Sequence, residues 1–209
     1  MKTMRMSDSA AASGSAPREK AKSIVLVGVG GQGTILISKI ITAGLMKMGY
    51  DVKMSEIHGM SQRGGSVSTM IKYGEEVYAP NVGVGEADMI ISFEKIEALR
   101  ALPYLKKGGK LITDDREIFP MPVLTGAAAY PFETIDELKK VVPDVMVIQA
   151  AEVAEKLGNI RAQNIVLLGA FVKAMGLADK ADWRQLVADY VPAKARELNL
   201  AAFDAGFQM

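Results

Sequence analysis

The sequence predicts an α/β fold, and three observations support that class. Short apolar runs rich in β-branched residues alternate with segments whose apolar residues recur at helical spacing. A glycine-rich turn at residues 28–33 separates the first such run from the first helical segment. The residues after 149 are mostly helical in pattern. Alternation of this kind is typical of layered proteins whose ligands bind at the carboxyl ends of parallel strands.

The first elements have the pattern of a strand, a helix and a second strand. Residues 23–27 form a β-branched run and are expected to be a buried strand. Residues 34–47 repeat apolar side chains at helical spacing and are followed by Gly49, which suits the position just past a helix end. Residues 51–54 begin a second strand. We expect the two strands to form a parallel pair joined by a right-handed crossover.

An antiparallel addition to the sheet is predicted next. Residues 56–65 are polar and glycine-rich, and we expect them to form a loop. Residues 67–73 alternate between apolar and polar side chains, Gly74 and Glu75 suit a turn, and residues 76–78 suit a returning strand. The pattern therefore predicts a hairpin.

The remaining elements continue the alternation. In order, the sequence predicts a strand at 89–93, a helix at 94–105, a turn at 107–109, a strand at 110–113, a helix at 133–142 and a strand at 145–149. The complete prediction is a Rossmann-like layered fold with a central parallel sheet, an added antiparallel hairpin or small sheet, and a helical C-terminus.

Length and composition predict one folded domain. The chain has 209 residues, of which 49% are apolar and 23% charged, as in soluble globular proteins. We expect residues 22–209 to form a single α/β domain and residues 1–21, which are small, polar and unpatterned, to be a disordered tail. No apolar run approaches the ~20 residues of a membrane helix, and no secretory signal is recognisable. A cytoplasmic location without membrane contact is therefore expected.

Charge and residue types exclude several classes of function. The net charge is +1, but residues 1–22 hold five basic and two acidic groups, so the remainder is slightly negative. That distribution argues against a nucleic-acid partner. The chain has no cysteine and one histidine, so it offers no iron–sulfur ligands and no multi-histidine metal site. No metal site is predicted, and any redox centre would be an organic cofactor or belong to another subunit.

The glycine turn G-V-G-G-Q-G at residues 28–33 matches G-x-G-x-x-G between a predicted strand and helix. The tight turn, the close approach of backbone to ligand and the packing of helix on strand each require glycine, and the helix start favours an anion. The predicted cofactor-binding residues are Gly28, Gly30, Gly31, Gln32 and Gly33. A dinucleotide site, with Glu56 as its ribose-binding carboxylate, and a turn that serves packing alone both remain open.

The segment S-E-I-H-G-M-S-Q-R-G-G-S at residues 55–66 carries the densest group of candidate functional side chains. Arg63 suits bidentate binding of a carboxylate or phosphate, and His58 suits proton or hydrogen-bond donation near neutral pH. Both are predicted catalytic residues. The predicted substrate, CoA or subunit-interface residues are Glu56, His58, Gly59, Ser61, Gln62, Arg63, Gly64 and Gly65. Alternatively, His58 bonds only to backbone and Arg63 pairs with Glu56 or Glu94.

These two segments together resemble the beta subunits of indolepyruvate:ferredoxin oxidoreductases, and more widely the gamma domain of pyruvate and 2-oxoglutarate oxidoreductases. The wider family usually carries a tyrosine-glycine-proline type run where this chain has residues 58–60, H-G-M. Further matching positions are G-E-A-D at 85–88, Asn164 with Leu168 and Gly169, and Asn199, Phe203 and Gly206. The resemblance covers residues 22–207 and favours the aryl-pyruvate branch.

The resemblance implies oxidative decarboxylation of an aryl 2-oxo acid to an acyl-CoA, with electrons passed to ferredoxin. It implies a large partner subunit that carries thiamin diphosphate, magnesium and iron–sulfur clusters. CoA would be a co-substrate, and no cofactor would be bound by this chain alone. The subunit would be inactive by itself. It implies that residues 30–33 and 63–65 face CoA phosphate or substrate carboxylate, with His58 and Gln62 at the subunit interface.

Other functions remain open from the sequence. A gamma subunit of a pyruvate or 2-oxoglutarate oxidoreductase shares the glycine turn and the R-G-G run. A stand-alone NAD(P)-binding reductase would use the glycine turn and Glu56, and it predicts tight dinucleotide binding by the isolated chain. A nucleotide-sensing module would bind ligand without joining a cofactor-bearing enzyme.

Overall fold

The computed structural model describes residues 20–58 and 64–209. Six strands in these ranges form one mixed sheet in the order β2-β3-β1-β4-β5-β6. The strands are β1 (Lys22–Val29), β2 (Asp51–His58), β3 (Ser66–Gly74), β4 (Ala87–Ser92), β5 (Leu105–Asp114) and β6 (Val145–Ile148). The sheet and the helical C-terminus confirm the predicted α/β class. Most of the predicted tail lies outside the described residues, and the division at residue 22 stays a prediction.

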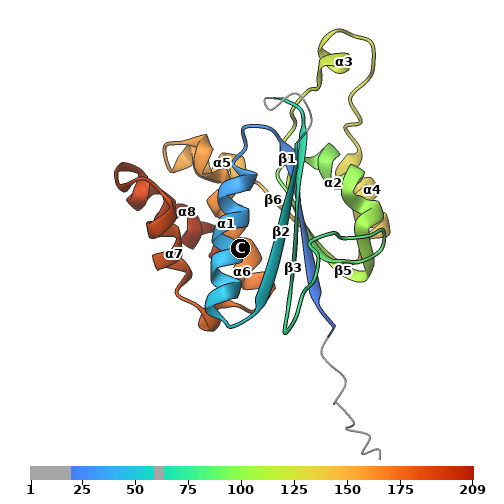
Figure 1. Cartoon of the computed structure of the whole chain (residues 1–209). Coiled ribbons are helices and arrows are strands. Elements are labelled where there is room, and N and C mark those ends of the chain that lie inside the picture. The colour runs from blue at the N-terminus through green and yellow to red at the C-terminus, as the bar shows by residue number, and fades with distance from the viewer. Residues whose placement is uncertain (1–19, 59–63) are drawn as a thin grey trace, which may run out of the picture.

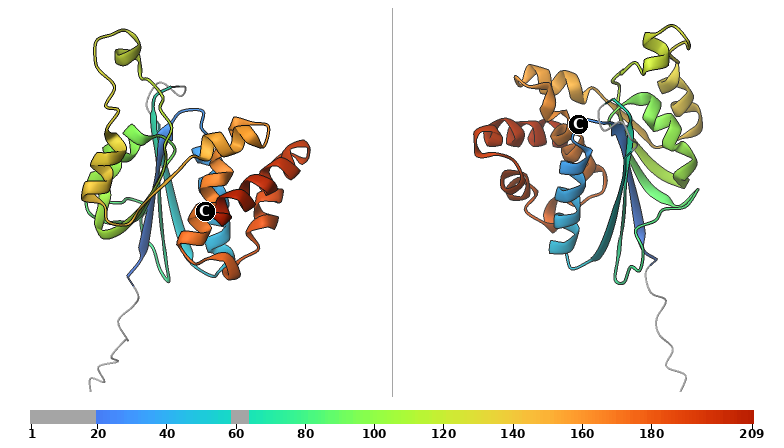
Figure 2. Two further views of the ribbon diagram at one scale, coloured as in Figure 1. Left: turned by 180° about the vertical axis from the view of Figure 1, so that it is seen from behind. Right: turned by 45° about the horizontal axis from the view of Figure 1, so that its top comes forward.

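Helices cover both faces of the sheet (Figure 1). One face carries α1, α5, α6, α7 and α8, and the other carries α2 and α4 (Figures 1 and 2). The α-helices are α1 (Thr34–Lys47), α2 (Lys95–Ala101), α3 (Met121–Leu124), α4 (Thr134–Val141), α5 (Ala150–Lys156), α6 (Gln163–Ala174), α7 (Trp183–Tyr190) and α8 (Arg196–Gln208). Short 3₁₀ turns occur at Leu102–Tyr104, Ile160–Ala162, Ala178–Lys180 and Ala193–Ala195.

The predicted pairing of the first two strands is wrong. β1 and β2 run in the same direction, but β3 lies between them and pairs antiparallel with both. The register joins Ile71 of β3 to Ile24 on one side and to Met54 on the other. β3 therefore lies where direct pairing of β1 with β2 was expected, and β2 becomes an edge strand of the sheet.

The predicted hairpin at Gly74 is also wrong. Residues 76–78 form no strand; instead the Val77 N–H donates to the Asp51 carboxylate at 2.9 Å, which ties this segment to the start of β2 by a side chain. The hairpin consists of β2 and β3, and residues 59–65 connect them. β2 continues to His58, so residues 56–58 belong to a strand rather than to the predicted loop.

The predicted helix at 94–105 ends early. α2 stops at Ala101, a 3₁₀ turn with Pro103 follows, and β5 begins at Leu105. Proline cannot supply the N–H that a continuing helix needs, which accounts for the early end. The predicted turn at 107–109 lies inside β5, where the pairing with β4 shifts register.

Alternating side chains of the strands divide the core into two layers. Ile24 and Leu26 pack with α1 and α6, whereas Val25 and Val27 pack with Ala98 of α2. Side chains of one strand alternate between the two faces of a sheet, so β1 contributes to both layers. The described helices offer no segment long and apolar enough to cross a bilayer.

The helical layer is tightest where α6 meets α8. A Cβ atom on Gly206 would lie 1.9 Å from the Val166 carbonyl oxygen, and one on Gly169 would lie 2.2 Å from that of Phe203. Glycine at both positions lets the two backbones touch. This contact closes the layer that supports α1 and the turn before it.

Candidate functional site

The candidate site lies at the carboxyl ends of β1, β2, β4 and β5, at the top of Figure 1. The glycine turn follows β1, and residues 59–65, the remainder of the predicted loop at 56–65, connect β2 to β3 at the same end. β1 and β4 are neighbours, although β2 and β3 lie between them in the chain. The site therefore lies at the switch point where ligands of open α/β sheets usually bind.

Backbone hydrogen bonds join the two predicted halves of the site. The Gly30 N–H donates to the Gly65 carbonyl at 2.8 Å, and the Gly64 N–H donates to the Gly30 carbonyl at 3.3 Å. Three predicted site residues thus lie side by side. The Gly30 N–H is already used in this contact, so it is not available to a ligand.

Gln32 ties the glycine turn to the end of β4. Its side chain is buried; Nε2 donates to the Phe93 carbonyl at 2.7 Å, and Oε1 accepts the Val29 N–H at 2.7 Å. A Cβ atom on Gly28 would lie 2.9 Å from Oε1 of Gln32. This geometry favours a positioning role for Gln32 over direct ligand contact.

The last part of the glycine turn leads into α1. Gly31 and Gly33 have φ values of 103° and 84°, which favour glycine, and a Cβ atom on Gly31 would meet open space. The Asn164 amide donates to the Gly33 carbonyl at 3.4 Å and supports the turn from α6. The N–H groups of Gly31, Gly33 and Thr34 have no acceptor among the described residues. These groups, at the positive end of the helix dipole, are suited to bind an anion.

Glu56 is a candidate for contact with a ligand or partner. It lies on β2 opposite Thr69, and its buried Oε1 atom has no hydrogen-bond partner in the part of the chain that the structure describes. A buried carboxylate oxygen without a donor is unfavourable, which favours a donor from outside the described residues.

The other loop predictions are only partly placed. His58 pairs with Val67 through the β2–β3 register. Gly59, Ser61, Gln62 and Arg63 lie outside the described residues, so their predicted roles stay predictions. Of the two alternative partners predicted for Arg63, Glu94 accepts three hydrogen bonds from other described residues, and a pairing of Arg63 with Glu56 or Glu94 stays a prediction.

The Glu94 carboxylate accepts several hydrogen bonds at this end of the sheet. The sequence predictions gave Glu94 no functional role of its own. One carboxylate oxygen accepts the Tyr130 hydroxyl at 2.6 Å and the Ile118 N–H at 3.3 Å, and the other accepts the Glu97 N–H at 3.0 Å. Burial, reinforced by the bond to Glu94, raises the pKa of Tyr130. The sequence did contain a signal for this role of Glu94, because an acidic residue there directly follows a predicted buried strand.

Asp114 caps a helix from the end of β5. Its carboxylate accepts the Ala150 and Ala151 N–H groups at 2.9 and 3.2 Å, and burial raises its pKa to about 7. A cavity of about 420 Å³ beside it is mostly acidic. The acidic side chains that line it are Asp114, Asp115, Glu117, Glu152 and Glu155. This lining disfavours a phosphate or carboxylate ligand. The described residues contain no group of three or more His, Cys, Asp or Glu arranged to hold a metal ion.

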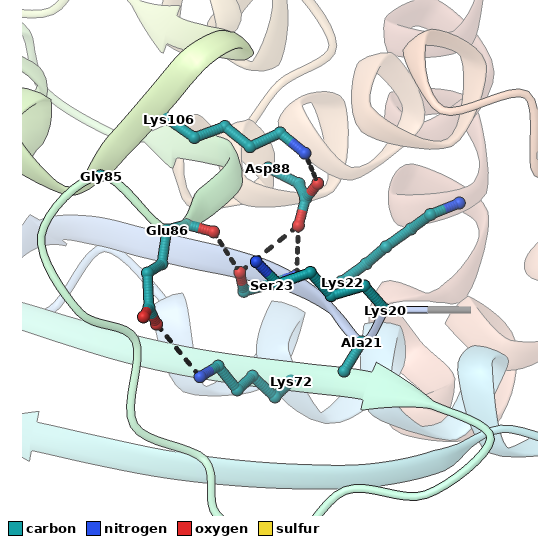
Figure 3. A pocket seen from close by; sticks show the side chains of 9 residues that line it. All are labelled: Lys20, Ala21, Lys22, Ser23, Lys72, Gly85, Glu86, Asp88 and Lys106. Carbon is teal, nitrogen blue, oxygen red and sulfur yellow. Dashed lines mark hydrogen bonds and ion pairs between the residues drawn. The ribbon is translucent and has the colours of Figure 1, made fainter. Parts of the chain in front are cut away.

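A second cavity, of about 370 Å³, lies at the opposite end of the sheet (Figure 3). Four lysines line it, but Lys72 pairs with Glu86 at 3.2 Å and Lys106 pairs with Asp88. These pairs neutralise much of its positive charge. None of the predicted site residues lines this cavity.

Comparison with known proteins gives a consistent result. The family model "Pyruvate ferredoxin/flavodoxin oxidoreductase" matches residues 23–209. The chain is 40% identical to indolepyruvate oxidoreductase subunit IorB of Thermococcus kodakarensis, over 90% of this chain and 95% of that protein. It is 28% identical to 2-oxoglutarate synthase subunit KorC of Methanothermobacter thermautotrophicus, over 91% of this chain and 96% of that protein.

A solved structure shares the fold. The 2-oxoglutarate:ferredoxin oxidoreductase from Magnetococcus marinus, with 2-oxoglutarate, coenzyme A and succinyl-CoA bound, matches with a TM-score of 0.68 at 20% identity. The match covers 91% of this chain and 31% of that longer chain. The α/β domain described above therefore corresponds in fold to one part of a larger enzyme.

Proposed function

The chain belongs to the pyruvate ferredoxin/flavodoxin oxidoreductase family, and we propose that it is the small subunit of a CoA-dependent indolepyruvate:ferredoxin oxidoreductase. The observation that carries the proposal is 40% identity to an indolepyruvate oxidoreductase subunit over nearly the full length of both chains. The lower identity of 28% to a 2-oxoglutarate synthase subunit favours the aryl-pyruvate substrate. We place the complex in the cytoplasm.

The proposed reaction is the oxidative decarboxylation of an aryl 2-oxo acid. The bond between the carboxylate and the 2-oxo carbon breaks and CO₂ leaves. The acyl carbon forms a thioester with the sulfur of CoA, whose S–H bond breaks with release of a proton, and ferredoxin, a one-electron carrier, accepts the two released electrons in two steps. Iron–sulfur clusters would be held by a larger partner subunit, because this chain has no cysteine to ligate a cluster. We propose that the same partner holds thiamin diphosphate and magnesium.

This chain would contribute anion binding and closure of the active site. The N–H groups of Gly31, Gly33 and Thr34 would bind a CoA phosphate or the substrate carboxylate, and Arg63 would bind the same anionic group. His58 and Gln62 would line the contact with the larger subunit. The bonds between Gly30 and residues 64 and 65 support this arrangement, since they hold the glycine turn beside the two residues that directly follow Arg63 in the sequence.

The first test is an assay of the complex purified with the larger subunit. We expect CoA-dependent reduction of ferredoxin with indolepyruvate or phenylpyruvate, and at least about tenfold lower kcat/KM with 2-oxoglutarate or pyruvate. A preference for 2-oxoglutarate or pyruvate would instead assign the chain to the corresponding gamma subunits. Tight NAD(H) binding by the isolated chain, with no larger partner, would contradict the proposal and favour a reductase.

The second test addresses Arg63. In the Arg63→Ala complex we expect the KM for CoA or for the 2-oxo acid to rise about tenfold or more, because a charge-assisted contact to the anion is lost. Arg196→Ala, on the exposed start of α8, is the matched control and should leave both KM values unchanged. Unchanged KM and kcat in Arg63→Ala would remove Arg63 from the site.

A further inference from the structure

An arm without charged side chains extends from the carboxyl end of the sheet. The arm comprises residues 118–132, between Glu117 and Glu133, and α3 forms its tip. Figures 1 and 2 show it projecting beyond the sheet and both helical layers. Its large exposed apolar side chains are Phe119 (41% exposed), Met121 (67%), Leu124 (63%) and Phe132 (62%). A protruding apolar surface of this kind is typical of a contact with another macromolecule.

The tip of the arm is folded rather than extended. The Thr125 N–H donates to the Met121 carbonyl at 2.9 Å, and the Ala127 and Ala128 N–H groups both donate to the Pro122 carbonyl, at 2.8 and 3.0 Å. These bonds hold Met121 and Leu124 on one helical turn. A preformed tip loses little conformational entropy when it binds, which favours a docking role.

The base of the arm is held by the candidate site itself. The Glu94 carboxylate accepts hydrogen bonds from Ile118 on the outgoing leg and from Tyr130 on the returning leg. The Phe119 ring lies 4.8 Å from that of Tyr130, and the Phe132 ring lies 5.1 Å from it, between ring centroids. The two legs are thus joined. Glu94 directly follows Phe93, whose carbonyl accepts a hydrogen bond from Gln32 of the glycine turn.

We propose that this arm is the docking element that inserts into an apolar groove of the larger, cofactor-bearing subunit. The inference rests on the proposed function, which requires such a partner at the carboxyl end of the sheet. The arm projects from that end, and Glu94 and Gln32 connect it to the predicted binding turn. The groove would be uncharged at its floor, because the arm offers no side chain to pair with a buried charge.

The test compares two double variants of the chain for binding to the purified larger subunit. Met121→Ser/Leu124→Ser removes apolar surface from the tip. Met46→Ser/Val141→Ser is the matched control, since these side chains are 60% and 59% exposed on α1 and α4. We expect the tip variant to raise Kd at least about 30-fold and the control to leave Kd within about twofold.

Turnover gives a second readout. At concentrations above its own Kd, the tip variant should restore the wild-type kcat, because the arm docks the subunit and does not take part in the reaction. A kcat that stays low at saturation would contradict a pure docking role.

Three results would overturn the inference in distinguishable ways. If wild type binds the larger subunit and the tip variant binds equally well, the arm proposal fails while the proposed function stands. If wild type binds no cofactor-bearing subunit, the proposed function fails and the inference with it. If the isolated wild-type chain dimerises in analytical ultracentrifugation and the tip variant is monomeric, the arm binds a second copy of this chain instead of the larger subunit.

Discussion

At the carboxyl end of the sheet, polar side chains are buried and bonded to backbone groups; at the amino end, charged side chains pair near the surface. Gln32, Glu94 and Asp114 each reach an element distant in sequence, and each bonds to a backbone N–H or carbonyl group there. Lys72 and Lys106 pair with carboxylates around an open cavity (Figure 3).

The two ends therefore contribute differently to stability. Removing one partner of a buried hydrogen bond leaves the other without water or a substitute, at a cost of about 1–3 kcal/mol for each group. Exposed ion pairs are typically worth about 0–1 kcal/mol, because water solvates both charges once they separate. The polar contacts at the carboxyl end should therefore contribute more to stability than the ion pairs at the amino end.

The largest effect is expected at Gln32. Gln32→Ala leaves the Val29 N–H and the Phe93 carbonyl unpaired and opens a small cavity, so we expect the free energy of unfolding to fall by about 2–4 kcal/mol. Urea unfolding measures it. Gln185→Ala, an exposed glutamine on α7, is the control and should cost less than about 0.5 kcal/mol. Equal losses in both variants would remove the distinction between a buried and an exposed amide.

A smaller, pH-dependent effect is expected at Asp114. Its pKa is raised by burial to about 7 in the folded protein from 3.8, so the folded state holds a proton that the unfolded state loses between about pH 4 and 7. The free energy of unfolding should therefore fall as pH rises through this window. Asp114→Asn removes the titrating carboxyl group. We expect the fall in the free energy of unfolding across this pH window to be about 1–2 kcal/mol smaller in this variant than in wild type.

Urea unfolding of both proteins at pH 5 and pH 8 measures the change. Asp115→Asn is the control, since Asp115 is exposed and its side chain makes no bond to α5 in the described structure. An Asp114→Asn profile as steep as that of wild type would show that another group carries the pH dependence.

Local patterns in the sequence predicted where helices and strands lie along the chain better than they predicted which strands pair in the sheet. The predicted bounds of α1 agree with the structure, because apolar periodicity and Gly49 are local signals. The position of β3 between β1 and β2 was missed, because strand pairing depends on residues far apart in the chain. The Val77–Asp51 bond that replaces the predicted return strand is likewise a long-range contact.

The same limit applies to the candidate site. The family resemblance predicted that Gly30 and Gly65 belong to one site, and in the structure their backbones are hydrogen-bonded. The motif did not predict that the Gln32 amide bonds to Phe93, because that requires knowing that β4 adjoins β1. The arm had a signal in the sequence, a run without charge from 118 to 132, but only the fold shows that this run is exposed.

The smallest effect is expected at the amino end, where Lys106 pairs with Asp88 and the lysine side chain is 44% exposed. Lys106→Ala should lower the free energy of unfolding by less than about 1 kcal/mol, and the difference should shrink when salt is raised from 0.05 to about 0.5 M, because ions screen exposed charges. Asp88 also accepts the Ser23 N–H at 2.8 Å, so Asp88→Ala should cost more than Lys106→Ala. Urea unfolding of both variants at the two salt concentrations measures the contrast. A loss at Lys106 as large as that at Gln32, insensitive to salt, would mean that the amino end is also a fixed polar site, and the lysine cavity would then be a candidate for anion binding.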